Sequence, residues 1–124
     1  MANLSIRIEG LKEFTKMMTK YPEISGRNLQ DAIKKSISAI EAEAVPRTPK
    51  DTGRLQGGYR AKFKPLRGEL VNPVEYAVIQ HETLHFHHNV GEAKFLEKGA
   101  QAASSHIEKF FNDAISKTLK QITR

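Results

Sequence analysis

A long apolar stripe near the C-terminal end is the feature that most constrains the fold of this chain. Apolar residues recur there every three or four positions, which is the period of one face of an α-helix. Lysine and arginine gather after the stripe, where cations interact favourably with the negative end of a helix dipole. The pattern predicts a C-terminal helix that buries one face, formed by Leu96, Ala100, Ala103, Ile107, Phe111, Ala114 and Thr118.

A second stripe predicts another long helix, from Glu23 to Val45. Pro22 suits the first turn of this helix, and Pro46 is expected to end it. A shorter amphipathic helix is predicted just before it, over residues 11–21. The apolar face of the long helix is formed by Leu29, Ile33, Ile37, Ile40 and Ala44.

Alternation of apolar and polar residues predicts three strands. Residues 4–8 form the first, and residues 59–64 form the second, with one apolar and one basic face. Residues 69–72 return after a turn at 65–68, which predicts a hairpin. The Pro-, Gly- and Asp-rich stretch 46–58 is predicted to be a loop. Residues 74–82 fit either a short helix opened by Pro73 or a further strand.

Composition places the chain among soluble globular proteins. Its 124 residues predict one domain, residues 1–124, and 39% are hydrophobic while 27% are charged. No run approaches the roughly 18 apolar residues of a membrane span, and the N-terminus lacks the pattern of a secretory signal. There is no cysteine, which excludes disulfides and thiolate metal sites. The net charge of +6 is compatible with an acidic partner such as nucleic acid.

The segment HETLHFHH, residues 81–88, contains the pattern H-E-x-x-H. On a helix, His81 and His85 would face the same way and could bind one zinc ion. Glu82 would then take the proton of the metal-bound water, and His88 would follow one turn later as a third ligand. The pattern thus makes a small zinc metallopeptidase the alternative hypothesis for this chain.

Two observations favour a loop instead. The residues after His85 are polar, and a histidine-rich tract meets the three fixed positions of the pattern by chance. We therefore interpret these histidines, and His106 in the last helix, as exposed residues. We expect neither a catalytic residue nor a metal or other cofactor, although metal binding by the cluster stays open.

Basic residues dominate the stretch from Arg47 to Arg67. Within it, Arg60, Lys62 and Lys64 alternate along a predicted strand and share one face. Such a row suits a phosphate backbone, but it also suits a solvated edge strand that lysine protects from unwanted pairing. The candidates for DNA contact are Arg47, Lys50, Arg54, Arg60, Lys62 and Lys64.

Three ordered segments resemble a known family. They are PKDTGRL at residues 49–55, EYAVIQHE at residues 75–82, and Phe95-Leu96 at the start of the last helix. Over residues 5–120 the chain resembles the tail-completion, or head–tail joining, proteins of tailed bacteriophages, also called minor capsid proteins. Their patterns are P-x-D-T-G-x-L, Y-A-x-x-x-E and P-F-L. The chain departs from them at residues 83–84 and 92–94, where a Gly-Thr turn and a Pro-Arg pair are missing.

The resemblance implies an α+β fold, with a small antiparallel β-sheet packed against two long α-helices. It implies no enzymatic activity, and a virion protein assembled in the cytoplasm of a bacterial host, from a free phage or a prophage. The expected partners are other copies of the chain in a ring, commonly a hexamer, together with tail tube and head connector proteins. Double-stranded DNA would pass through the lumen with non-specific contact, and no membrane is involved.

A ring subunit needs heterologous contact surfaces, and the two loops after the first long helix and after residue 81 could provide them. The candidates for contact between subunits are Asp51, Thr52, Leu55, Glu82, His85 and Phe86.

Overall fold

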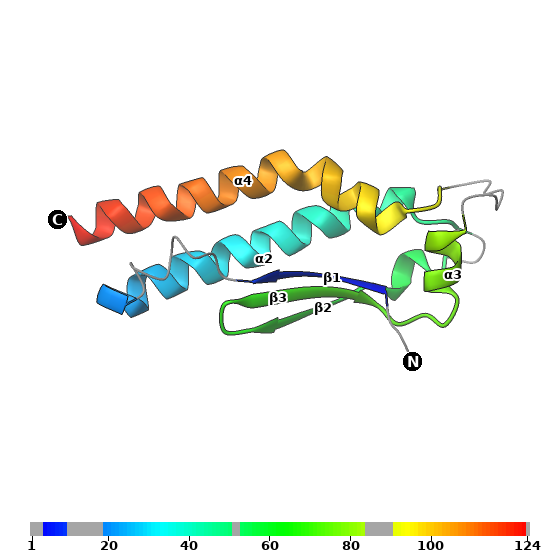
Figure 1. Ribbon diagram of the computed structural model, residues 1–124, viewed down its shortest axis with the longest axis horizontal. Helices are drawn as coiled ribbons and strands as arrows, with labels where there is room; N and C mark the ends of the chain where they lie inside the picture. The colour runs from blue at the N-terminus through cyan, green and yellow to red at the C-terminus, as the bar shows by residue number, and fades with distance from the viewer. Residues whose placement is uncertain (1–3, 10–18, 51–52, 84–90, 124) are drawn as a thin grey trace.

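The computed structural model describes residues 4–9, 19–50, 53–83 and 91–123. The chain has an α+β fold, as the resemblance implies (Figure 1). Its elements in chain order are β1 (Leu4–Glu9), α2 (Pro22–Arg47), the 3-10 helix η1 (Gln56–Gly58), β2 (Arg60–Lys64), β3 (Arg67–Asn72), α3 (Ala77–Glu82) and α4 (Phe95–Ile122).

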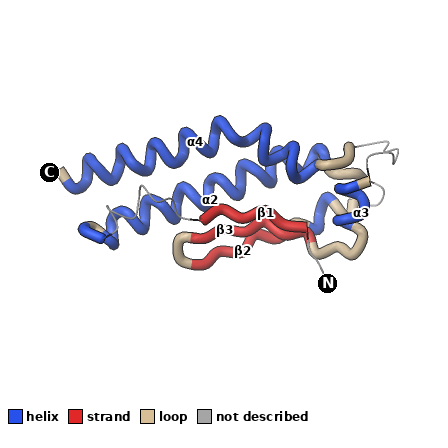
Figure 2. The backbone as a smooth tube through the Cα atoms, viewed as in Figure 1, coloured by secondary structure: helices blue, strands red, loops and turns tan. Residues whose placement is uncertain are grey.

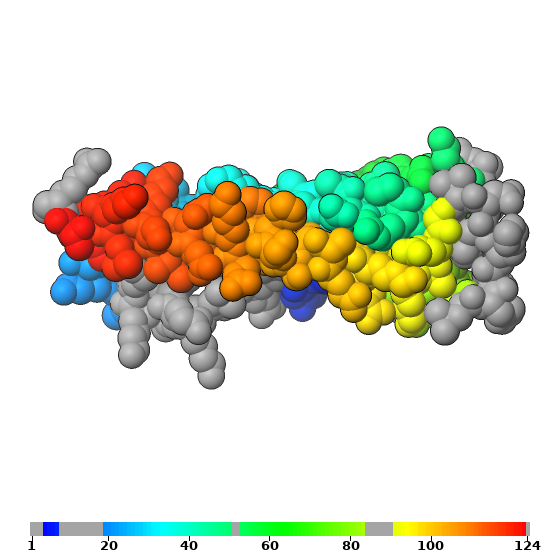
Figure 3. All heavy atoms as spheres, turned by 90° about the horizontal axis from the view of Figure 1, so that it is seen from above, coloured from blue at the N-terminus to red at the C-terminus, as the bar shows by residue number. Residues whose placement is uncertain are grey.

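The elements form three layers, in which α2 lies between the sheet and α4 (Figure 2). The two long helices are antiparallel and lie side by side, and α4 runs along the length of an elongated molecule (Figure 3). The short helix α3 lies at the end of the molecule where α2 ends and α4 begins. The middle layer, α2, therefore has to bury residues on two sides.

The sheet has the strand order β1-β3-β2, and both pairs are antiparallel. The predicted hairpin is confirmed, although β3 begins at Arg67 and the turn is shorter than expected. Leu66 occupies this turn with a φ of 58°, and its backbone N–H donates to Gln30 Oε1 of α2 at 2.6 Å. This bond holds the hairpin turn against α2.

The sheet packs on α2 through the central strand β3. Gly68 of β3 faces Ile33 and Ile37, and a Cβ atom at this position would lie 2.6 Å and 2.9 Å from their side chains. The edge strand β2 is exposed along its whole length, because α2 packs mainly over β3. The predicted apolar face of β2 is therefore only partly covered, and Phe63 is 41% exposed.

The two long helices are in close backbone contact where Gly99 of α4 meets Ala44 of α2. A Cβ atom on Gly99 would lie 2.8 Å from the Ala44 Cα. Near the other end of the pair, Asn28 Nδ2 donates to Thr118 Oγ1 at 2.9 Å and to Gln121 Oε1 at 2.8 Å. The predicted stripe of α4 is confirmed at its buried positions, which are Leu96, Ala103, Phe111, Ala114 and Thr118.

Pro46 does not end α2, contrary to the prediction, because the helix continues to Arg47. A proline removes one backbone N–H, but the last turn has side chains that bind its free carbonyl groups. Arg47 Nη1 donates to Glu43 O and Thr48 Oγ1 donates to Ala44 O, both at 2.7 Å. Thr48 thus binds one of the carbonyl groups left free at the end of the helix, and Arg47 adds a second bond to Glu43 O.

The open choice over residues 74–82 is decided in favour of a helix. Asn72 Oδ1 accepts the Val74 N–H at 3.2 Å, which makes a turn, and α3 then starts at Ala77. The third strand of the sheet is β1. The predicted helix over residues 11–21 falls mostly outside the described residues, which show helix at Thr19 and Lys20.

The glycine at the helix contact gives a stability prediction. Gly99→Ala should destabilise the protein by about 1–3 kcal/mol, because the added methyl group meets backbone that no side-chain rotation can clear. Gly26→Ala in α2 is the matched control, since nothing lies within 4 Å of its Cβ position. It should stabilise by roughly 0.5–1 kcal/mol through helix propensity alone. Urea unfolding followed by circular dichroism would measure both. A stabilising Gly99→Ala would contradict the close helix contact.

Candidate functional site

The three segments that carry the family resemblance come together at one end of the molecule (Figure 1). Leu55, Ala77, Phe95 and Leu96, one or two from each segment, are buried in the same core cluster. These residues are far apart in sequence, so their contact is a property of the fold. We call this region the motif end and define it as the described residues 47–50, 53–59, 73–83 and 91–97.

Arg54 and Glu75 connect the first two segments. Arg54 Nη1 and Nη2 donate to the two carboxylate oxygens of Glu75 at 2.9 Å and 2.8 Å, and the guanidinium also lies 5.7 Å from the centre of the Tyr76 ring. This paired hydrogen bond raises the pKa of Arg54 and lowers the pKa of Glu75. A fork of two parallel bonds fixes direction as well as distance. It thereby sets the position of one segment relative to the other.

Buried hydrogen bonds hold the loop that follows α2. Thr48 Oγ1 donates its single proton to Ala44 O, so the Tyr59 hydroxyl, 2.7 Å away, donates to Thr48. Asn72 Nδ2 donates to Leu55 O at 2.9 Å, and Gln56 Nε2 donates to Thr48 O at 2.9 Å. Of the loop predicted at 46–58, residues 46–47 belong to α2, and the described residues 48–50 and 53–58 are held by these bonds and include η1.

His81 connects α3 to the start of α4. Its ring lies edge-on to Phe95 with 4.9 Å between ring centres, and the residue is only 5% exposed. The Glu97 backbone N–H donates to His81 Nε2 at 3.3 Å, so Nδ1 carries the proton and donates to Glu82 at 2.7 Å. Lys94, the N-cap residue of α4, has no capping side-chain bond, and the His81 ring supplies that function from another helix.

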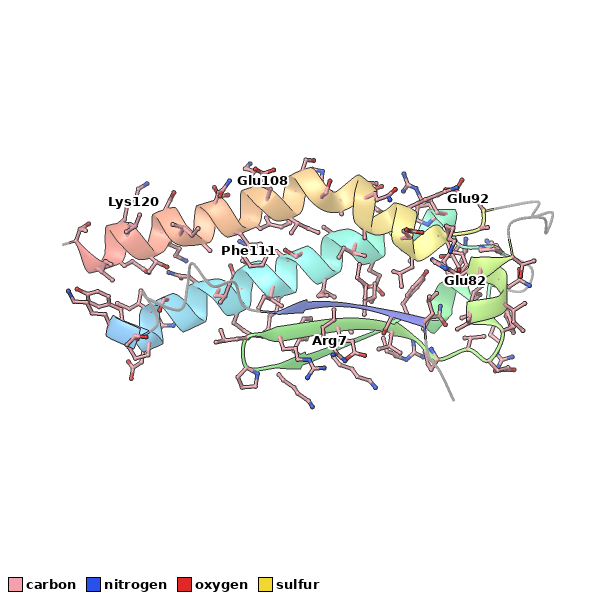
Figure 4. The ribbon with its side chains drawn as sticks, in the orientation of Figure 1. Arg7, Glu82, Glu92, Glu108, Phe111 and Lys120 are labelled. Carbon is pink, nitrogen blue, oxygen red and sulfur yellow. The ribbon has the colours of Figure 1, made fainter. Side chains whose placement is uncertain are left out.

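Charged side chains surround this junction (Figure 4). Lys94 Nζ binds the Glu82 carboxylate, and the Lys94 backbone N–H donates to His81 O at 2.7 Å. Lys94 is the main cause that lowers the pKa of Glu82, and His81 adds to it. The Glu92 N–H donates to Arg47 O at 2.8 Å, which joins the start of α4 to the end of α2.

Gly91 makes this last approach possible. Its φ is 92°, and a Cβ atom there would lie 2.6–2.7 Å from backbone atoms of residues 47–49. A larger residue would therefore push the segment before α4 away from the end of α2.

This geometry does not favour the zinc hypothesis. The helix α3 ends at Glu82, and Thr83 has extended angles, with φ −90° and ψ 95°, so the helix that should align His81 with His85 ends before it. Both ring nitrogens of His81 have protein partners. Within the described residues, no group of three or more potential ligands could hold a metal ion. His85 and His88 lie outside the described residues.

The interpretation of the histidines as exposed is wrong for His81, because its ring packs on Phe95 and binds the start of α4. His106 is exposed, as predicted. The spacing of His81 from Ala77 is one helical turn, so a search for a buried face could have found it. The polar neighbours at residues 85–89 concealed that signal.

The six predicted DNA-contact residues divide into two groups. Arg47 binds Glu43 and lies 3.9 Å from Glu92, and Arg54 binds Glu75, so carboxylates offset both charges within the molecule. The other four are exposed at residues 50, 60, 62 and 64. Three of these form the predicted row on β2, namely Arg60, Lys62 and Lys64.

The predicted subunit-contact residues have different environments. Leu55 is 3% exposed and belongs to the core cluster. Its side chain therefore packs inside the subunit and is not available for contact with another copy. Glu82 is exposed, with its carboxylate bound to Lys94. The other four lie outside the described residues, and they are Asp51, Thr52, His85 and Phe86.

No protein-family model matches the sequence, and no curated protein and no solved structure is significantly similar to it. Among the described residues, no helix has the length and apolar character needed to cross a membrane.

The position of His81 gives a prediction that separates a structural histidine from a metal ligand. His81→Ala should lower the free energy of unfolding by roughly 2–4 kcal/mol, because it leaves a cavity and removes a helix cap. His106→Ala, on the exposed face of α4, should change it by less than about 0.5 kcal/mol. The protein purified without a histidine tag should contain no stoichiometric zinc. Stoichiometric zinc that is lost in His81→Ala would instead support the metallopeptidase.

Tyr59 gives a prediction at alkaline pH. Burial raises its pKa from 10.0 to about 12. Below pH 10 the tyrosine is protonated in both folded and unfolded chains, so the full stability is present. Between pH 10 and 12 the unfolded chain loses the proton first, and stability should fall by up to about 1.4 kcal/mol per pH unit. In Tyr59→Phe this fall should be smaller, while Tyr76→Phe should behave as wild type. Urea unfolding at pH 9–12 would measure the difference, and identical pH profiles would contradict it.

Proposed function

We propose that this chain is a structural subunit of the head–tail junction of a tailed phage or prophage, where identical copies form a ring. The observation that carries the proposal is the meeting of the three motif segments at the motif end. Segments that merely resembled a family by chance would have no reason to pack on one another. The Arg54–Glu75 fork, which joins two of them, adds to this support.

The bonding at the motif end is that of a scaffold. Arg54 is directed to Glu75, Lys94 to Glu82, and His81 to the start of α4. These polar groups bind one another across segments that are distant in sequence, and each bond fixes one segment against the next. Such bonds stabilise a particular shape, which is what an assembly subunit needs.

Among the described residues, the large apolar side chains that are exposed lie at separate places, on β2, α3 and α4. Ile79 on α3 is 56% exposed at the motif end, and Phe63 on β2 is 41% exposed beside the α2 helix. Two unlike contact points on one molecule suit heterologous contacts, which close into a ring when the rotation between copies allows it. An isologous dimer would need only one such patch.

The test is to look for rings in the purified protein. Native mass spectrometry and negative-stain microscopy, over a range of concentrations and with neighbouring tail or connector proteins added, should show closed rings of one size. Ile79→Asp should shift the distribution toward monomer, because it places a charge in the contact. Leu119→Asp changes another exposed apolar residue, on α4, and should leave the rings intact.

Monomers under every one of these conditions would contradict the proposal. If Leu119→Asp disrupted rings and Ile79→Asp did not, the ring would stand but the contact would be misplaced. Circular dichroism of both variants would show that the fold is retained, since both residues are exposed.

A further inference from the structure

The outer face of the sheet, turned away from α2, is a basic surface. The strand register places Arg7 and Lys62 on either side of Glu69, and Lys64 opposite Arg67. Residues that pair across antiparallel strands share a face, so these side chains belong to one surface. Arg7 lies on the side of the sheet away from both long helices (Figure 4). We call this surface the basic sheet face and define it as Arg7, Arg60, Lys62, Lys64 and Arg67.

The two lysines of this face lack a neutralising carboxylate in the part of the chain that the structure describes. Among the residues that the structure describes, neither Lys62 nor Lys64 has an ion-pair partner. Glu69 lies 3.4 Å from Arg7, and the register places Glu9 opposite Arg67, so the acidic positions lie on β1 and β3. Positive charge is therefore concentrated along the exposed edge strand β2.

Arg60 extends the same row and is held in place. Its Nη1 donates to Tyr59 O at 2.8 Å and to Gly57 O at 3.0 Å, which directs the guanidinium along the start of the strand. Neither acceptor is an ionised group, so the positive charge is not offset. The contrast with Arg47 and Arg54, which both bind carboxylates, separates cations used inside the subunit from cations presented to the outside.

The length of this row is sufficient to reach more than one phosphate of a duplex. Alternate residues of a strand are about 6.6–6.8 Å apart, so the three cations of β2 span about 13 Å. One strand of a DNA duplex carries one phosphate for each 3.4 Å of helix axis. A straight row of this length could thus follow several phosphates of one strand. Phe63 points to the opposite face, toward Lys34 of α2, so it cannot stack on bases beside the row.

We propose that the basic sheet face binds the phosphate backbone of double-stranded DNA without reading its sequence. This names a partner for the proposed ring subunit, and it rests on that function for its biological setting. The binding itself depends on the cations of β2. Contacts of this kind are exchanged rapidly and allow the duplex to move relative to the protein.

The test uses the full-length chain and a labelled DNA duplex of about 20 base pairs. Fluorescence anisotropy would give the association constant over a range of NaCl concentrations. In Lys62→Ala/Lys64→Ala, binding at 0.1 M salt should weaken at least about tenfold, and the slope of log K against log salt should fall by about 1.8, or 0.9 for each lost phosphate contact. Both lysines are exposed, so the fold should be retained.

The matched control is Lys117→Ala/Lys120→Ala. It removes the same charge from exposed positions of α4, and Lys120 lies on the opposite side of the molecule from the sheet (Figure 4). This variant should keep the wild-type slope. If both double variants lost the same affinity, binding would reflect net charge alone and the assignment to the basic sheet face would be overturned.

Three other results would also overturn the inference. One is a wild-type chain that does not bind the duplex at low salt. Another is a Lys62→Ala/Lys64→Ala variant that aggregates but binds DNA as wild type does, which would make the lysines protectors of an edge strand. The third is a requirement for these lysines in binding to vesicles of phosphatidylglycerol but not to DNA.

Native mass spectrometry of the same samples keeps the two proposals separate. Rings without DNA binding would overturn only the inference about the basic sheet face. DNA binding by a chain that never forms rings would overturn only the ring.

Discussion

The two-sided burial of α2 is the interaction on which the rest of the structure depends. One side packs on β3 at Gly68, and the other packs on α4 at Gly99. At both places the neighbouring atoms leave no room for a methyl group, so each layer is positioned by direct contact with this helix. Close packing of this kind transmits position over the whole length of a rigid element. The relation between the sheet and the second long helix therefore follows from α2, which lies between them.

The motif end shows how the chain fixes a loop-rich region without a large core. After α2, hydrogen bonds from Thr48 and Asn72 hold the loop, and the His81 ring holds the start of α4. Each bond joins segments that are distant in sequence. Gly91 and Lys94, both with positive φ, let the chain approach α2 closely before α4 begins. The region is thus held by directional polar bonds in addition to the apolar contacts of Leu55, Ala77 and Phe95.

The long elements could be predicted from sequence, because the apolar stripes of α2 and α4 repeat over many turns and the hairpin alternates clearly. The ends of elements could not, as Pro46 shows: the helix continues one residue past the proline, and Thr48, which lies beyond the predicted end, binds a carbonyl of its last turn. The site was predicted only in part. The role of His81 depends on Phe95 and Glu97, which are 14 and 16 residues away, and local patterns do not contain such contacts. Leu55 was misread for the same reason, since its burial is created by three separate segments.

Basic residues that are neighbours in the sequence lie in different environments in the folded chain. In the sequence, the stretch from Arg47 to Arg67 is a single basic run. In the folded chain, Arg47 and Arg54 are bound to carboxylates and help to build the motif end, whereas Lys62 and Lys64 stand along an exposed strand. The fold thereby assigns the same kind of charge to two tasks. Cations that stabilise the shape of the subunit are offset by acids, whereas Lys62 and Lys64 on the sheet have no ion-pair partner among the described residues and, we propose, bind a polyanion. If copies associate through the motif end and through Phe63 on the α2 side of β2, the outer face of the sheet is left uncovered, and the same subunit can assemble and bind a polyanion with separate surfaces.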